Sequence, residues 1–412
     1  MNIFDVVVIG GGPAGMMAAS FAAQKNNRVL LLEKNATLGK KLLITGGGRF
    51  NVTNNKPVVR EMLSQYKTDG KFLFSTFVQH GVADTIKWFA DRGVSMKEEN
   101  EGRLFPDTEK AETIQQALVA ELEKRNVQVQ TGSAVRTIKS TKDRFDIELQ
   151  NGKRMQTRTC IVATGGTARP ETGSTGEGFG WLEQLGHTTI PNSYALVPIT
   201  LKSTWTAALS GISISDCKLT IRIDDKKHSV HQGKLLFTHV GMTGPTILNL
   251  SKTIGELLQY HNVVIGLNLF PSDDAASMDQ KLQSLFQAES NKKLRNALSS
   301  LVPMAIAKVV LEQCQIDGEQ PCNGVSRVER IPLGQFLQSI PLPVGGLLSK
   351  DKAVISAGGV RLEEVDFKTM ESRIVPGLFL VGEMLNINRP SGGYSLQLCW
   401  STGAVAGMYA GK

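Results

Sequence analysis

An apolar stretch that runs directly into closely spaced glycines constrains the fold of this chain more than any other feature. Val6-Val7-Val8-Ile9 leads into Gly10-Gly11-Gly12-Pro13-Ala14-Gly15, and Glu33 follows Gly15 by eighteen residues. Gly10 permits a tight turn, Gly12 the close approach of a pyrophosphate, and Gly15 the packing of a helix on a strand. The pattern predicts a buried strand, a helix over about residues 13–24 and a second buried strand over 29–32.

Glu33 completes this fingerprint. Its carboxylate, at the end of the second strand, can accept hydrogen bonds from both hydroxyls of an adenosine ribose, while the first N–H groups of the helix face the phosphates. A glycine-rich turn alone is common, but strand, glycines, helix, second strand and terminal acid together indicate an adenine dinucleotide site. The candidate residues are Gly10, Gly12, Pro13, Ala14, Gly15, Glu33 and Lys34.

Length and composition indicate a globular protein. The chain has 412 residues, 41% of them apolar, which favours two or three domains with a sizeable core. The first predicted strand begins within three residues of the N-terminus, and no stretch reaches eighteen uninterrupted apolar residues, so we expect neither export nor a membrane span. The five cysteines form no CxxC pair. We therefore expect reduced thiols in a cytoplasmic protein, and no metal.

The formal net charge of +8 is concentrated near the N-terminus, where residues 1–60 hold eight Lys or Arg against Asp5 and Glu33. A solvated basic face is one interpretation, and a surface that attracts phosphates is the other. No arginine-rich run or zinc finger demands nucleic acid, so RNA is compatible with the sequence but not required. We expect a small-molecule substrate, and the sequence leaves the oligomeric state open.

The organisation along the chain predicts an α/β protein with inserted segments. Strand and helix patterns alternate to about residue 190, and a strand over 159–163 ends in a second glycine turn. Short β-type pieces follow over 196–270, then helical spacing over 278–339, before strand-and-glycine patterns resume near Gly345. We predict a discontinuous Rossmann-like domain over 1–192 and 344–412, a β-rich insert over 193–272 and a helical subdomain over 273–343.

The C-terminal segment indicates which dinucleotide is bound. A predicted strand over 377–381 precedes Gly382-Glu383, and a glycine pair opens a helix that runs to about Ala410. A nicotinamide-binding domain needs no contribution from a segment this far along the chain, whereas FAD, which lies extended across the sheet, does need one. Glu383 can bind a ribityl hydroxyl, and the N–H groups of the last helix can face the flavin N1–C2=O edge, where reduction places negative charge. The candidates are Gly382, Glu383, Gly392, Gly393, Tyr394, Ser395 and Leu396.

The chain resembles the HI0933-like family of bacterial flavoproteins, the family of the BaiN, YhiN and aminoacetone oxidase types, over nearly its whole length. The resemblance rests on residues 10–15 with Glu33, on 39–54, on 163–166, on 236–245 and on 382–397. It implies a Rossmann-like FAD domain interrupted by a β-barrel-like insert and a helical subdomain, with the flavin held non-covalently. It also implies reduction of conjugated carbonyl compounds, oxidation of amines or reduction of uridine in ribosomal RNA. Phe50, Asn386 and Ser395 depart from the cysteine, aspartate and asparagine common in the family.

A triple-glycine loop is the most specific of these stretches. Gly46, Gly47 and Gly48 allow the backbone to pass against a planar ring, and their N–H groups can donate to a flavin or a bound anion. For Arg49 we consider two roles, a fixed positive charge near the flavin ring or one partner of a surface salt bridge. Asn51 could likewise contact the cofactor or form a turn. The further cofactor candidates are Lys41, Val135, Ala163, Thr164, Gly165 and Gly166.

The catalytic residues are less constrained, because a flavin supplies hydride chemistry and the protein needs only orientation and one acid. Arg49, Tyr394 and His239 are the candidates, with Cys399 as a further proton donor, and each has a structural role as its alternative. No second GxGxxG follows a strand around residues 130–200. NAD(P)H would therefore dock transiently as reductant, unless the substrate itself reduces the flavin.

Together these features predict an FAD-dependent oxidoreductase that reduces a conjugated double bond or oxidises an amine in a small organic substrate. Two alternatives remain. One is a flavin-dependent reductase that forms dihydrouridine in ribosomal RNA and uses the basic surface to hold phosphates. The other is a non-catalytic protein in which bound flavin only stabilises the fold.

Overall fold

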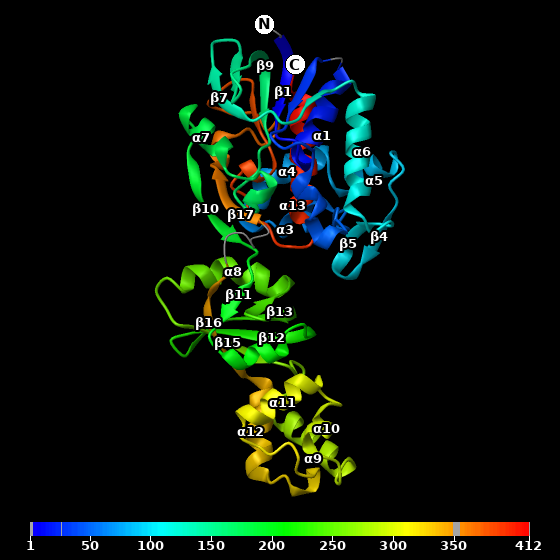
Figure 1. The fold of residues 1–412 in the computed structure, drawn as a ribbon, viewed down its shortest axis with the longest axis vertical. Coiled ribbons are helices and arrows are strands. Elements are labelled where there is room, and N and C mark those ends of the chain that lie inside the picture. Colours follow the sequence, from blue (N-terminus) through cyan, green and yellow to red (C-terminus); the bar gives the residue numbers. More distant parts are fainter. Residues whose placement is uncertain (1–2, 26, 349–354, 412) are drawn as a thin grey trace. The chain divides into compact units, whose positions relative to one another are not determined.

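The computed structural model describes residues 3–25, 27–348 and 355–411, and it separates into two compact units. The first unit comprises residues 1–194 and 354–412, and the second comprises 195–353. In Figure 1 the chain leaves the first unit in green and returns to it in orange and red. The predicted Rossmann-like domain interrupted by an insert is therefore confirmed.

A seven-stranded sheet forms the centre of the first unit, with the order β6-β2-β1-β9-β8-β7 and with β18 paired to β9. The parallel strands are β1 (Ile3–Ile9), β2 (Val29–Leu32), β6 (Gln128–Gln130), β9 (Arg154–Val162) and β18 (Leu378–Leu380), and β8 (Phe145–Leu149) runs antiparallel to both β9 and β7 (Val135–Ser140). Residues 6–9 and 29–32 are almost fully buried, as expected of parallel strands covered on both faces.

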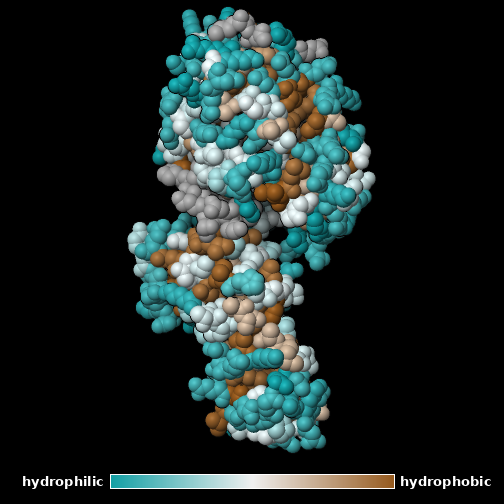
Figure 2. Space-filling view, viewed as in Figure 1, coloured by the Kyte–Doolittle hydropathy of each residue, from teal (hydrophilic) through white to brown (hydrophobic). Residues whose placement is uncertain are grey.

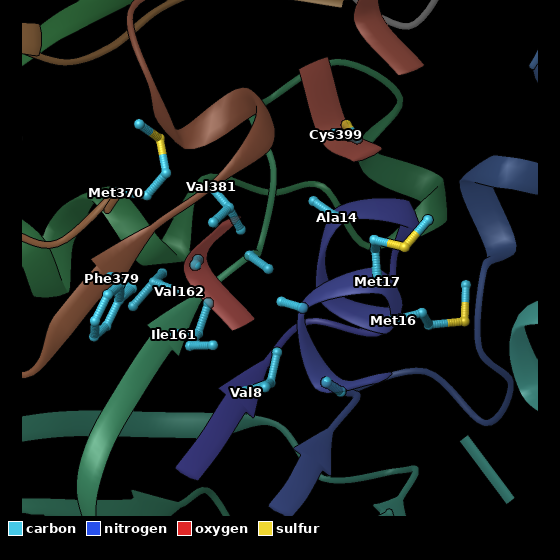
Figure 3. Packing of buried hydrophobic residues seen from close by; sticks show 14 of the residues in the cluster. Val8, Ala14, Met16, Met17, Ile161, Val162, Met370, Phe379, Val381 and Cys399 are labelled. Carbon is cyan, nitrogen blue, oxygen red and sulfur yellow. The ribbon is translucent and has the colours of Figure 1, made fainter. Parts of the chain in front are cut away.

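Two glycine-containing helices pack against each other beside this sheet. They are α1 (Pro13–Ala22) and α13 (Tyr394–Tyr409). A Cβ on Gly403 would lie 2.5 Å from the carbonyl oxygen of Ala14, and one on Gly407 would lie 2.4 Å from that of Ala18. Figure 3 shows α1 side chains near β1 and β9 residues, with Cys399 of α13 close by. Glycine thus lets the C-terminal helix lie directly on the first helix of the chain.

The remaining elements of the first unit surround this core. The helices are α2 (Lys40–Leu43), α3 (Val59–Ser64), α4 (Gly70–Gln79), α5 (Val82–Ala90), α6 (Ala111–Lys124) and α7 (Glu177–Gln184). A small antiparallel sheet joins β3 (Thr53–Asn54), β5 (Arg103–Pro106) and β4 (Met96–Glu99), and β10 (Thr189–Ala195) pairs with β17 (Ile355–Val360).

The second unit contains a closed barrel with the order β11-β14-β13-β12-β15-β16. Its strands are β11 (Ile199–Leu201), β12 (Ser213–Ile223), β13 (Lys226–Thr238), β14 (Gly241–Thr243), β15 (Val263–Asn268) and β16 (Ile340–Leu347). Its helices are α8 (Pro245–Leu257), α9 (Ala275–Ala288), α10 (Leu294–Leu298), α11 (Met304–Gln313) and α12 (Arg327–Gln338). Barrel and helices share one apolar cluster. The finer limits proposed for the β-rich and helical parts stay predictions.

Each unit has its own hydrophobic core. On the visible face of each unit, hydrophilic side chains alternate with patches of hydrophobic ones (Figure 2). Among the residues that the structure describes, no helix combines the length and apolar character needed to cross a bilayer. Within the same ranges, no group of three His, Cys, Asp or Glu side chains could hold a metal ion.

Candidate functional site

The turn after β1 leaves an open space at one of its glycines and none at the others. Gly10 has a φ of +109°, and a Cβ there would lie 2.5 Å from the carbonyl oxygen of Ala163. A Cβ on Gly15 would lie 1.9 Å from the carbonyl oxygen of Gly10. Around Gly12, in contrast, no heavy atom lies within 4 Å of the Cβ position. Gly10 and Gly15 therefore close the turn, and Gly12 leaves room for a group outside it.

The helix α1 begins at this open position. Its N-cap is Gly12, which has extended backbone and no side-chain cap, and Pro13 follows at the first helical position. The first N–H groups of a helix lack intrahelical partners and carry the positive end of the helix dipole. With Ala14 in the first turn, this end of α1 is arranged to bind an anion such as a phosphate.

Glu33 is buried at the end of β2 and held beside the glycine turn. Its Oε2 accepts a hydrogen bond from the Gly11 N–H at 2.7 Å. Its Oε1 accepts two bonds from Asn35, from the backbone N at 2.8 Å and from Nδ2 at 2.7 Å. A carboxylate has about four acceptor sites. The carboxylate can thus accept one ribose hydroxyl directly, and a second one after the Asn35 amide turns away.

Two other candidates flank this end of the sheet. Lys34 Nζ donates to Thr175 Oγ1 at 2.6 Å and pairs with Glu177 Oε2 at 2.8 Å, so its charge connects β2 with the start of α7. Val135 is buried at the start of β7. The Ser133 N–H, shortly before it, donates to the backbone oxygen of Glu33 at 2.8 Å. The segment leading to Val135 therefore lies alongside Glu33.

The turn after β9 lies against the turn after β18. Ala163 contacts the Gly10 position, as described above, and Thr164 Oγ1 donates to Met384 Sδ at 3.1 Å. Gly165 has a φ of +75°, its Cβ position is 3.9 Å from Glu383 Oε2, and Gly166 beside it is buried. The carboxyl ends of β9 and β18 thus meet at one place.

Glu383 is the centre of a buried ion cluster. Its Oε2 is 2.9 Å from Lys41 Nζ, and its Oε1 is 2.9 Å from a terminal nitrogen of Arg389. Burial raises the pKa of the Glu383 carboxyl, but the charges and hydrogen bonds of the two cations outweigh burial and lower the pKa to about 2. Glu383 is therefore a carboxylate at all ordinary pH values.

Arg389 was not among the residues predicted from the sequence. The Arg389 side chain is only 1% exposed, its Nε donates to Ser395 Oγ at 3.1 Å, and its Nη1 donates to the Ile387 oxygen at 2.6 Å. Long cations are usually solvated, so composition alone does not single this one out. The available signal is its place in the turn between Gly382-Glu383 and Gly392-Gly393.

The start of α13 is held by the segment around β3. Gly393 is the N-cap with a φ of +98°, and a Cβ there would lie 2.4 Å from the carbonyl carbon of Thr53. Asn51, with its amide in the orientation that satisfies its neighbours, accepts from the Gly393 N–H at 2.9 Å. Asn54 Nδ2 donates to the Gly392 oxygen at 3.2 Å. These two asparagines anchor the helix N-terminus, with Leu396 buried in its first turn.

The triple-glycine loop has left-handed backbone at every glycine. The φ angles of Gly46, Gly47 and Gly48 are 62°, 69° and 86°. The Cβ position of Gly47 has no heavy atom within 4 Å, so the loop leaves space beside it. Phe50 also has a positive φ, of 62°, and is fully buried with its ring 6.2 Å from that of Trp400. An unusual backbone is thus fixed by a packed aromatic side chain.

Arg49 has protein partners for its charge. Its guanidinium pairs with Glu99 and, at 3.0 Å, with Glu109, and it lies 4.5 Å from the centre of the Phe105 ring. The hydrogen bond to Glu99 raises the pKa of Arg49. Arg49 was expected to be either a fixed charge near the ring or the partner of a salt bridge, and the contacts in the structure are those of a salt bridge.

The other catalytic candidates lie in different units. Tyr394 is buried at the start of α13, its backbone oxygen accepts from Tyr66 Oη at 2.7 Å, and burial raises the pKa of its phenol. Burial, with the Glu383 charge, raises the pKa of the Cys399 thiol to about 12. His239 is exposed between β13 and β14 of the second unit. Tyr394 and Cys399 are thus part of the α13 region, and both hold their protons at neutral pH.

Comparison with known proteins identifies relatives over nearly the whole chain. A ribosomal RNA dihydrouridine synthase of Escherichia coli is 30% identical over 98% of this chain and 96% of its own length. A ribosomal RNA dihydrouridine synthase of Haemophilus influenzae is 31% identical over 89% of this chain and 88% of its own length. A 3-dehydro-bile acid delta(4,6)-reductase of Clostridium scindens is 28% identical over 92% of both chains.

Solved structures share the fold at low identity. A flavocytochrome c3 fumarate reductase has a TM-score of 0.55 at 15% identity and covers all of this chain and 78% of its own. A 3-ketosteroid-delta4-(5alpha)-dehydrogenase of Rhodococcus jostii has a TM-score of 0.52 at 16% identity, with coverage of 100% and 97%. The family model for the HI0933-like protein Rossmann domain matches residues 4–409. The chain therefore belongs to the HI0933-like family.

Proposed function

We propose that this protein binds FAD non-covalently across the carboxyl edge of the seven-stranded sheet and acts as an oxidoreductase. The order of the strands supports this proposal. Strands β2, β1, β9 and β18 are neighbours in that order, and they end at Glu33, at the Gly10–Gly15 turn, at the Ala163–Gly166 turn and at Gly382-Glu383. An extended dinucleotide would meet an adenosine site, a pyrophosphate site and a ring site in the same order.

The residues present fit the cofactor. The open space at Gly12 and the uncapped start of α1 would take the pyrophosphate, and Glu33 would hold the adenosine ribose. Gly392–Leu396 would hold the ring through the N-terminus of α13, which Asn51 and Asn54 position. The proposed roles of Lys34, Lys41, Val135 and Gly46–Gly48 are to border these three sites.

Bound FAD would carry two electrons as hydride from a reduced nicotinamide to the β-carbon of a conjugated carbonyl compound, and a proton on the α-carbon would complete the product. The protein's part is to orient substrate and exclude water at the ring. Tyr394 is the proposed proton donor, because it is buried at the start of α13 with its phenol protonated. Arg49 is a less suitable donor, since two carboxylates hold its guanidinium.

The names of the relatives favour reduction of a double bond as the reaction. A delta(4,6)-reductase and a dihydrouridine synthase both saturate a carbon–carbon bond conjugated to a carbonyl group. We therefore place reduction of a small conjugated carbonyl compound before oxidation of an amine. Anaerobic stopped-flow mixing with NADH and NADPH, then with an enone or a primary amine, tests this order. Rapid reduction of the flavin by the amine, with no reoxidation of reduced flavin by the enone, would instead favour amine oxidation.

Loss of the adenosine contact tests the site itself. Glu33→Arg removes the ribose acceptor and puts a bulky cation in a buried position, so we expect purified protein to lose most of its flavin absorbance. Glu123→Arg, at an exposed position of α6, is the matched control and should keep it. Equal flavin content in both folded variants would refute the proposed site. Flavin that neither NAD(P)H nor any substrate bleaches would instead indicate the non-catalytic alternative.

An RNA substrate is a second candidate, supported by exposed basic residues on α3, on the segment after it and on α4. Arg60, Lys67 and Lys71 are exposed, and no ion pair involves them within the described ranges. Phe74, one turn after Lys71, is 47% exposed. Basic side chains beside an exposed aromatic ring suit single-stranded RNA. Ribosomal RNA binding that falls with salt, and falls further in Lys67→Glu/Lys71→Glu than in the exposed control Lys142→Glu, would support it.

A further inference from the structure

The buried ion cluster of Lys41, Glu383 and Arg389 contains two cations and one carboxylate. Both cations contact the same carboxylate, one on each oxygen, at 2.9 Å. Because the pKa of Glu383 is about 2, the carboxylate is fully ionised at neutral pH. These three groups together therefore carry one excess positive charge. The side chains of Arg389, Glu383 and Lys41 are 1%, 10% and 25% exposed, so solvent screens the charge of Arg389 weakly and that of Lys41 more strongly.

The cluster lies where three elements of the candidate site meet. Arg389 Nε donates to Ser395 Oγ, on the second residue of α13. Glu383 Oε2 is 3.9 Å from the Cβ position of Gly165, in the turn after β9. Lys41 comes from α2, which precedes the triple-glycine loop. The excess charge and the positive end of the α13 dipole therefore act on the same space.

A ring that becomes negative on reduction would be stabilised in that space. A flavin that takes up two electrons and one proton gains one negative charge, whereas uptake of two electrons and two protons leaves its charge unchanged. A nearby fixed positive charge favours the one-proton process, because its attraction acts only on the charged product. The structure supplies such a charge without any movement of the protein.

We infer that the charges of Lys41 and Arg389 raise the reduction potential of the bound flavin and favour reduction with uptake of a single proton. The inference rests on the proposed FAD site and extends it to two cations that hold each other in place through Glu383. Their role is electrostatic, and neither needs to contact the substrate. A reduced nicotinamide supplies the two electrons and the proton together as hydride, whereas dithionite supplies the electrons and water supplies the proton.

A series of charge variants tests this role. Arg389→Met and Lys41→Met each reduce the cluster charge from +1 to zero, while Glu383 keeps one cationic partner. We expect each to shift the oxidised-to-reduced ratio at fixed potential about tenfold toward the oxidised form, a fall of about 30 mV for a two-electron couple. Arg389→Lys retains the charge and should stay near the wild-type potential. If the role of Arg389 were purely structural, Arg389→Lys would change the potential as much as Arg389→Met does.

The pH dependence of the potential gives a second readout on the wild-type protein. Uptake of one proton with two electrons makes the potential fall with pH half as steeply as uptake of two protons. We expect the shallower slope in the wild-type protein already between pH 5 and 6, where a flavin free in solution takes up two protons. Wild-type potentials in flavin-loaded Arg389→Met and Lys41→Met, or the steeper slope in the wild-type protein, would overturn the inference. A wild-type protein that binds no flavin would refute the proposed function instead.

Discussion

The two ends of the proposed cofactor site are built in different ways. The glycine turn, the helix and the acid of the adenosine and pyrophosphate end come from one continuous segment, from β1 through α1 to Glu33, and the hydrogen bond from the Gly11 N–H to Glu33 joins residues 22 positions apart. The ring end joins segments around residues 41–54, 163–166 and 382–396, with contacts such as Lys41 to Glu383 that span 342 positions. Local spacing therefore specifies the first end, and tertiary packing assembles the second.

The largest expected effect comes from breaking the local end at a single backbone contact. In Gly15→Ala the new Cβ would lie 1.9 Å from the Gly10 carbonyl oxygen, so strand and helix must separate. We expect a loss of about 3 kcal/mol of unfolding free energy, together with the flavin. Denaturant unfolding and flavin absorbance measure both.

Gly12→Ala is the matched control at the same turn. Its Cβ meets no heavy atom within 4 Å, so the free energy of unfolding should change by about 1 kcal/mol or less. Flavin affinity should nevertheless fall, because the methyl group occupies the space proposed for the pyrophosphate. If the two variants unfold alike, the roles assigned to the two glycines are wrong.

The contrast between the two ends also explains what could be predicted from the sequence. The Rossmann-like fold and its insert follow from periodicity and glycine spacing, because strands and βα turns depend on neighbours in sequence. The partners of Asn51, Arg49 and Glu383 do not follow from spacing, because each lies on a distant segment that only the folded chain brings near. Arg389 was missed for this reason, and Asn35 was missed because an amide three residues after a strand is common in turns.

An intermediate effect is expected at the ring end when its carboxylate is protonated. The pKa of Glu383 is about 2 in the folded protein, below its ordinary value of 4.5. The ion cluster therefore contributes its full stability above pH 4.5, and this contribution is lost as the pH falls from 4.5 toward 2. The loss should amount to about 3 kcal/mol at most.

Urea unfolding at pH 6, 4 and 3 measures this contribution when wild type is compared with Glu383→Gln. Other carboxylates titrate in both proteins, and only the wild type titrates at residue 383. We expect the stability difference between them to shrink toward acid pH. A difference that is constant from pH 6 to pH 3 would show that the cluster does not couple to folding.

The smallest expected effect sharpens the account of the adenosine end. Asn35 gives two hydrogen bonds to Glu33 Oε1, and its side-chain amide also donates to the Thr172 oxygen at 3.0 Å. Asn35→Ala removes the side-chain donor and leaves the backbone bond, so Oε1 gains a vacant acceptor site for the second ribose hydroxyl. We expect FAD to bind as tightly as in the wild type or up to about fivefold more tightly, the value of one hydrogen bond. Glu33→Gln, which turns one acceptor into a donor, should weaken binding. If Asn35→Ala weakens binding as much as Glu33→Gln does, the asparagine is needed to orient the carboxylate, and the local end depends on a tertiary contact to residue 172 after all.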